Sequence, residues 1–179
     1  MRKNGTKIRV LFLIVLIGAA LVAFVLLPRR GQAPLPPNAR ADFVLVEKAS
    51  HTMTLFEHGQ PIRTYRIALG RGGLRQKLQA GDNKVPEGMY RIAGRNPKST
   101  FHRALRISYP LPEQEIQARQ RGLAAGGDIM IHGIRNGLGW IGSMQRRFDW
   151  TKGCIAVDDA EIEEIWRVVP DGTPIEIRP

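Results

Sequence analysis

The chain has 179 residues, which is enough for one domain with a substantial core plus a short additional segment. Its hydrophobic content of 43% and charged content of 24% are ordinary for a globular protein. A formal net charge of +11 would suit a nucleic-acid partner, but six of the basic residues lie within residues 1–30, and the others form no basic run with interleaved aromatic residues. The composition therefore argues against a nucleic-acid partner, while a mild attraction to an anionic polymer fits it.

The N-terminal part has the pattern of a membrane anchor. Residues 10–27 form an uncharged apolar stretch of about the length that spans the hydrocarbon core of a bilayer. Four basic residues within residues 1–9 favour a cytoplasmic N-terminus, although Arg29 and Arg30 after the stretch weaken that bias. A cleaved signal peptide is the alternative, but its apolar region is usually shorter and ends in a small-residue cleavage site. We expect an uncleaved transmembrane signal anchor in the inner membrane, with the rest of the chain facing the periplasm or cell wall.

The remainder, residues 41–179, has the pattern of a mainly β domain with two short helices, preceded by a Pro-rich linker at residues 28–40. Strands are expected where β-branched and aromatic residues lie between turn residues, at 42–48, 52–57, 60–69, 89–93, 104–108, 128–132 and 173–178. One helix is expected at 112–121, with proline at its first position and glycine past its end. The other is expected at 158–168, where Asp158 and Asp159 are assigned to helix capping.

Residues 128–157 hold the side chains that suggest chemistry, the only cysteine, Cys154, and one of four histidines, His132. A thiol becomes a nucleophile at neutral pH when a nearby imidazole lowers its pKa and accepts its proton. Gly133 leaves the histidine ring approachable, and Gly153 allows an unusual backbone conformation and the close approach of a substrate carbonyl. The N–H groups of Gly153 and Cys154 are candidate donors to an oxyanion. Cys154, His132 and Gly153 are therefore the candidate catalytic residues.

Two alternatives use the same residues without nucleophilic catalysis. A single cysteine can be an inert core residue that packs as a small apolar side chain. A metal site of Asp128, His132 and Cys154 is conceivable, but these residues lack the close-set ligand pairs usual for zinc. We therefore expect no metal and no cofactor.

Two motifs in this region match a family signature. Ile-His-Gly at residues 131–133 and Thr-Lys-Gly-Cys-Ile at residues 151–155 are placed with 18 residues between His132 and Thr151. This arrangement resembles the signature of L,D-transpeptidases with a YkuD-type catalytic domain. Residues 82–90 are similar to the family's Thr-Pro-x-Gly-x-Phe/Tyr segment.

The resemblance covers residues 41–179 and implies an L,D-transpeptidase-like β-sandwich or barrel that acts on peptidoglycan stem peptides. It implies that Cys154 is the nucleophile and His132 the general base. In the implied reaction, the cysteine attacks the carbonyl after the L-centre of meso-diaminopimelate, D-alanine leaves, and an amine on a second stem or on a wall-linked protein accepts the peptide. Water as the acceptor would instead give an L,D-carboxypeptidase or an amidase. A non-catalytic wall-binding domain is a further alternative.

The sequence departs from the family pattern beside the cysteine. The usual motif has histidine and arginine where this chain has Lys152 and Ala156, and Val85 stands where threonine is common. The form of residues 150–157 is similar to a subgroup of short, membrane-anchored members, some of which look like hydrolases that remove groups attached to the wall. The departures leave the nucleophile and base in place and concern the acyl acceptor and the substrate side chain.

Overall fold

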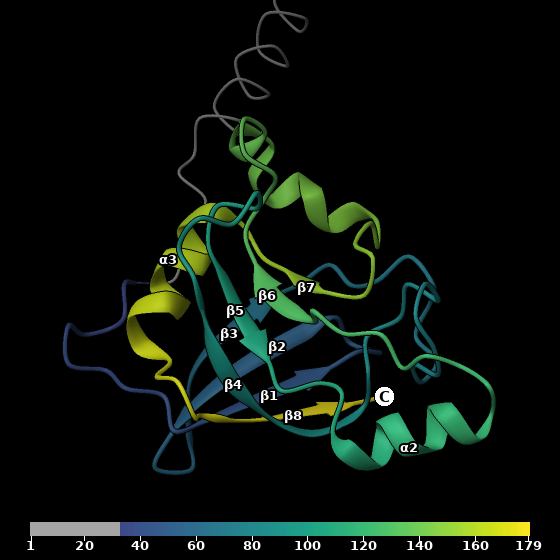
Figure 1. Cartoon of the computed structure of the whole chain (residues 1–179). Coiled ribbons are helices and arrows are strands. Elements are labelled where there is room, and N and C mark those ends of the chain that lie inside the picture. Colours follow the sequence, from purple (N-terminus) through teal and green to yellow (C-terminus); the bar gives the residue numbers. More distant parts are fainter. Residues whose placement is uncertain (1–32) are drawn as a thin grey trace, which may run out of the picture. The chain divides into compact units, whose positions relative to one another are not determined.

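A curled, eight-stranded β-sheet forms the centre of the part of the chain that the structure describes, residues 33–179 of this computed structural model (Figure 1). The strand order is β3-β2-β1-β8-β4-β5-β6-β7. The bounds are β1 Phe43–Glu47, β2 Thr52–Glu57, β3 Gln60–Arg66, β4 Gly88–Asn96, β5 Ala104–Ile107, β6 Met130–His132, β7 Ile155–Ala156 and β8 Pro174–Arg178. Neighbours are antiparallel except for the pairs β1–β8 and β6–β7, which are parallel. The predicted mainly β fold is confirmed.

The segment after β3 closes the sheet against its far edge. Ala68 forms an antiparallel bridge with Ala156 of β7, and the two residues exchange N–H···O bonds of 2.9 and 2.8 Å. Gly70 forms a second, parallel bridge with Thr151. Because these bridges join the two ends of the strand order, the sheet closes on itself like a barrel, and the segment before β7 is held from both sides.

Three helices lie in the described part of the chain, one more than the sequence predicted. The helices α2 (Pro112–Gln120) and α3 (Asp159–Val168) match the two expected ones. The third, η1 (Gly139–Arg147), is a 3₁₀ helix interrupted at Gly142, where φ is 47° and ψ is −133°. A short 3₁₀ helix broken at a glycine does not show the 3.6-residue period of an α-helix, so the hydrophobic pattern did not reveal it. The prediction of two helices is therefore wrong.

The α3 helix packs on the sheet through the apolar stripe that the sequence indicated. Ile162 and Ile165 are fully buried, while Trp166 is half-buried. Asp158 accepts the N–H of Glu161 at 2.9 Å, and the Glu161 carboxylate accepts the N–H of Asp158 at 3.0 Å. This reciprocal capping box fixes the start of α3 four residues after the cysteine and confirms the predicted cap at Asp158.

The compact unit begins at Leu35, inside the stretch predicted as a linker. The Leu35 side chain joins the core, and its N–H donates to Glu164 of α3 at 2.9 Å. Arg167 of the same helix donates to the carbonyls of Leu35 and Pro36 at 3.1 and 3.0 Å. This part of the chain is therefore docked against α3.

The predicted cytoplasmic segment and signal anchor, residues 1–9 and 10–27, lie outside the described residues. Within residues 33–179, no helix is long and apolar enough to cross a membrane.

Candidate active site

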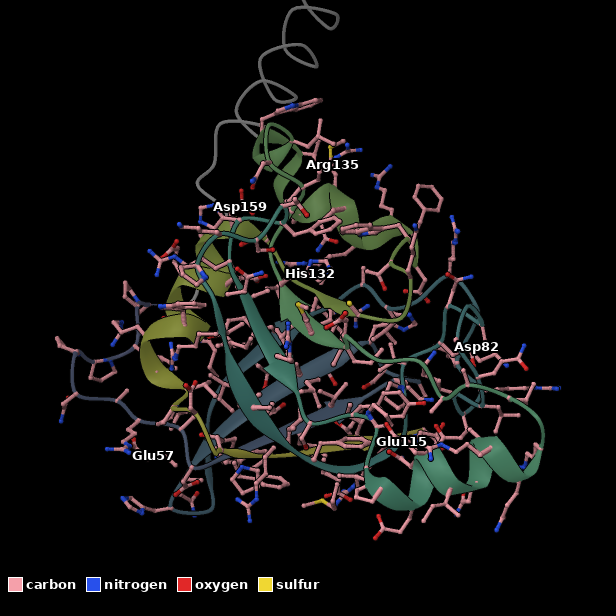
Figure 2. All side chains as sticks on the ribbon, viewed as in Figure 1. Glu57, Asp82, Glu115, His132, Arg135 and Asp159 are labelled. Atoms are coloured by element: carbon pink, nitrogen blue, oxygen red, sulfur yellow. The ribbon has the colours of Figure 1, made fainter. Side chains whose placement is uncertain are left out.

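His132 ends strand β6 and lies near the middle of the view in Figure 2. In the parallel pairing of β6 with β7, Ile131 lies opposite Ile155, and both side chains are buried in the core. Because side chains alternate along a strand, His132 faces away from that core. It is nevertheless only 4% exposed, since the rings of Phe101 and Trp150 pack against the imidazole at centroid distances of 4.6 and 5.7 Å.

One hydrogen bond defines the tautomer of His132. Its Nδ1 lies 2.7 Å from the backbone carbonyl oxygen of Gly133. A carbonyl only accepts, so Nδ1 carries the hydrogen and Nε2 of the neutral ring is left to accept a proton. Burial lowers the pKa of the imidazole, and the hydrogen bond to Gly133 opposes that shift. His132 therefore has the protonation state that a general base needs.

Cys154 is partly buried just before β7, and its thiol approaches the carbonyl oxygen of Asp128 at 3.5 Å. Burial raises the pKa of the thiol. The backbone hydrogen bond from Met130 and the charge of Lys77 lower it, while the charge of Asp128 raises it further, and the net direction is upward. The free protein therefore holds a neutral thiol. A nearby imidazole can lower the pKa of a thiol, but in the free protein burial outweighs the neighbouring charges and the pKa of Cys154 is raised.

Gly153 occupies a position that only glycine suits. Its φ is +119°, and a Cβ there would lie 2.8 Å from the carbonyl oxygen of Lys84. Its N–H donates to the hydroxyl of Thr151 at 3.1 Å, and that hydroxyl donates to the carbonyl of Cys154 at 2.7 Å. Thr151 thus fixes the turn that presents the cysteine. One of the two expected oxyanion donors, the N–H of Gly153, is already engaged in this turn.

Cys154 and His132 open into the same cavity, whose volume is about 700 Å³. The other lining residues are Arg71, Phe101, Ile134, Arg135, Leu138, Ile141, Met144, Gln145, Phe148, Trp150, Thr151 and Lys152. The walls are mostly apolar, and a cavity of this size and character is typical of a substrate site. The two sequence-predicted side chains are therefore brought to one site.

The 3₁₀ helix η1 forms one wall of this cavity. Arg146 pairs with Asp158 at 2.8 Å and with Glu161, which ties η1 to the start of α3. Gln145 accepts the indole N–H of Trp150 at 2.8 Å and so holds one of the rings that cover His132. This wall and the aromatic rings around the histidine were not predicted from the sequence, since only tertiary contacts bring them to the site.

The alternative metal site does not form. The side chain of Asp128 is 77% exposed and faces Arg106, 3.5 Å away. Across residues 33–179, no group of three or more His, Cys, Asp or Glu residues is placed to hold a metal ion.

A family model describing the L,D-transpeptidase (YkuD) catalytic domain matches residues 41–177. The chain belongs to this family. The match includes both candidate residues and the curled sheet except for Arg178, the last residue of β8. A comparison with curated protein sequences gave no match.

Solved structures agree with the family in fold. Two structures of the helical cell shape determining protein Pgp2 from Campylobacter jejuni are 24% and 25% identical, with TM-scores of 0.61 and 0.59. They cover 78% of this chain and 47% and 48% of Pgp2. Bd1075 of Bdellovibrio bacteriovorus is 25% identical, with a TM-score of 0.53, and the match covers 78% of this chain and 48% of Bd1075. An L,D-transpeptidase from Xylanimonas cellulosilytica is 17% identical, with a TM-score of 0.51, and the match covers 80% of this chain and 63% of that structure. This chain thus matches about half the length of Pgp2 and Bd1075.

The raised pKa of Cys154 predicts a specific alkylation profile. The rate constant for iodoacetamide should keep rising with pH beyond the range of an ordinary thiol, because only the thiolate reacts. In urea the unfolded chain exposes the thiol, and the pH midpoint of the alkylation rate should return to the range of an ordinary thiol. A plateau between about pH 6 and 8 in the folded chain would instead indicate a thiolate–imidazolium pair and contradict the neutral resting state.

Proposed function

We propose that this chain is a peptidoglycan L,D-transpeptidase that acts on stem peptides through a cysteine acyl-enzyme. The observation that carries the proposal is the shared cavity. It is lined by Cys154 and by the buried imidazole of His132, whose Nε2 is left to accept a proton. Membership of the L,D-transpeptidase family supports the same chemistry. The aromatic cover over His132 supports it too, because excluding water strengthens electrostatic interactions in the site.

The acylation step follows from the protonation states. The proton of the Cys154 thiol passes to His132 Nε2 while Sγ attacks the carbonyl after the L-centre of meso-diaminopimelate. The C–N bond then breaks, and the proton on His132 goes to the amine of the leaving D-alanine. The stem peptide is left as a thioester on Cys154.

Deacylation repeats these steps with a new nucleophile. The amine of a second stem peptide, or of a wall-linked protein, gives a proton to His132 and attacks the thioester carbonyl. The C–S bond breaks, and the proton returns to the sulfur of Cys154. If water is the acceptor, the same steps make the enzyme an L,D-carboxypeptidase or an amidase.

The charges around the cavity support an acidic substrate. Among the described lining residues, the charged side chains are Arg71, Arg135 and Lys152, and all three are cations. No ion pair with another described residue engages them. The N–H of Arg71 donates to the carbonyl of Thr151 at 3.0 Å, and Lys152 follows Thr151 in the chain. Both cations therefore lie next to the residue whose hydroxyl bonds the Cys154 carbonyl. Stem peptides carry free carboxylates, which these cations complement.

We also propose that the enzyme is anchored in the inner membrane. The apolar, uncharged character of residues 10–27 supports a signal anchor, and the catalytic domain would then face the periplasm, where peptidoglycan is found.

Incubation of the full chain with purified muropeptides tests the reaction. We expect products that depend on Cys154 and are absent with Cys154→Ala, and we expect His132→Gln to slow their formation about 10²–10⁴-fold. Mass spectrometry separates the outcomes, since cross-linked dimers indicate transfer and shortened monomers indicate hydrolysis. Equal product from the unmodified chain and Cys154→Ala, or none from either, would contradict the proposal, and binding without any product would favour a wall-binding domain.

The cationic side of the cavity predicts a preference for free carboxylates. Arg71→Gln and Lys152→Gln should each raise KM for a stem tetrapeptide about 10-fold, with a smaller effect on a peptide whose carboxylates are amidated. Arg75 and Lys98 are exposed and do not line the cavity, so Arg75→Gln and Lys98→Gln are matched controls. An equal rise in KM with both peptides would show that these cations do not bind the carboxylates.

A further inference from the structure

A carboxylate lies on the far side of the peptide group that holds His132. The carbonyl oxygen of Gly133 accepts from His132 Nδ1 at 2.7 Å. The N–H of the same planar peptide group belongs to Ile134, and it donates to Asp159 Oδ1 at 2.8 Å. Two hydrogen bonds therefore run through one peptide group, from the imidazole to the carboxylate of Asp159.

The protein is built to hold Asp159 in this place. Asp159 is the first residue of α3, and the capping of that helix is already performed by its neighbours. A Cβ on Gly133 would lie 2.7 Å from Asp159 Oδ1, and a Cβ on Gly139 would lie 2.3 Å from Oδ2. Both glycines thus leave the room that the carboxylate occupies between the turn after β6 and the start of η1. Figure 2 labels Asp159 at the start of α3 and His132 at the end of β6.

We propose that Asp159 is a positioning residue that supports His132 through the Gly133–Ile134 peptide, an inference that rests on the proposed role of His132 as general base. A carboxylate that accepts from a peptide N–H polarises the group and makes its carbonyl a better acceptor. The carbonyl then holds the Nδ1–H tautomer more firmly. When Nε2 takes the thiol proton, the positive charge of the imidazolium is stabilised by the negative charge at the other end of the peptide.

The other titratable groups nearby make different contacts. Within the described cavity lining, the groups that titrate or carry charge beside His132 are Cys154, Arg71, Arg135 and Lys152. Around Asp159, the charged groups and their partners are Asp158 and Glu161 with Arg146, and Glu163 with His102 and Arg103. The carboxylate bonded to the peptide group that holds His132 is therefore that of Asp159.

Asp159→Asn separates the charge from the hydrogen bond, because the amide oxygen can still accept the N–H of Ile134. The loss of the negative charge should lower the pKa of His132 by about one unit. NMR titration of the imidazole in the full chain measures this shift, with the His132 signals assigned from their loss in His132→Gln. In the same variant, kcat/KM at neutral pH should fall by up to about tenfold.

Asp158→Asn is the matched control. It removes the same charge one residue away and retains a good N-cap, and it should shift the His132 pKa far less. Gly139→Ala is an independent test that leaves Asp159 unchanged. The added Cβ would displace the Asp159 carboxylate, so this variant should also lower the pKa of His132. This variant decides the matter if Asp159→Asn does not fold.

An unchanged His132 pKa in Asp159→Asn and Gly139→Ala, or an equal shift in Asp158→Asn, overturns the inference and leaves Asp159 as a support of the fold. The NMR readout does not require turnover. A lack of Cys154-dependent products would therefore count against the proposed function and not against this contact.

Discussion

The parallel pairing of β6 with β7 is the constraint on which the site depends. It places His132 at the end of one short strand and Cys154 directly before the next, and Ala68 closes the outer side of β7. Backbone hydrogen bonds therefore set the relative position of the two side chains, while the turn at Gly153 presents the thiol. Such a scaffold fits the proposed reaction, in which base and nucleophile must be positioned before the substrate arrives.

Burial then determines how this pair can react. It raises the pKa of Cys154 and lowers that of His132, so the free protein holds a thiol and a neutral imidazole. The thiol is thus not a standing thiolate, which is the form most readily oxidised. In the proposed reaction, the thiol proton is therefore transferred to His132 only when the sulfur attacks, and the Gly133 carbonyl then faces the charged imidazole.

The sequence predicted the elements whose pattern is local. Alternating strands, the stripe of Ile162 and Ile165, and the cap at Asp158 follow from neighbours a few residues apart. The two motifs pointed to Cys154 and His132, and both residues line one cavity. Features that depend on tertiary contacts were missed or misread. They include the broken 3₁₀ helix η1, the aromatic cover of the histidine and the upward pKa shift of the thiol. The carboxylate next in sequence to the cap was assigned to capping, yet it bonds a peptide 25 residues earlier in the chain.

Intact-protein mass spectrometry of the full chain after exposure to a carbapenem, which acylates a reactive nucleophile, tests directly whether Cys154 forms an acyl-enzyme. We expect the mass to rise by one carbapenem, Cys154→Ala to gain none, and His132→Gln to gain it much more slowly, because the imidazole is the proposed base that takes the thiol proton. Equal labelling of the unmodified chain and Cys154→Ala would contradict an acyl-enzyme on Cys154.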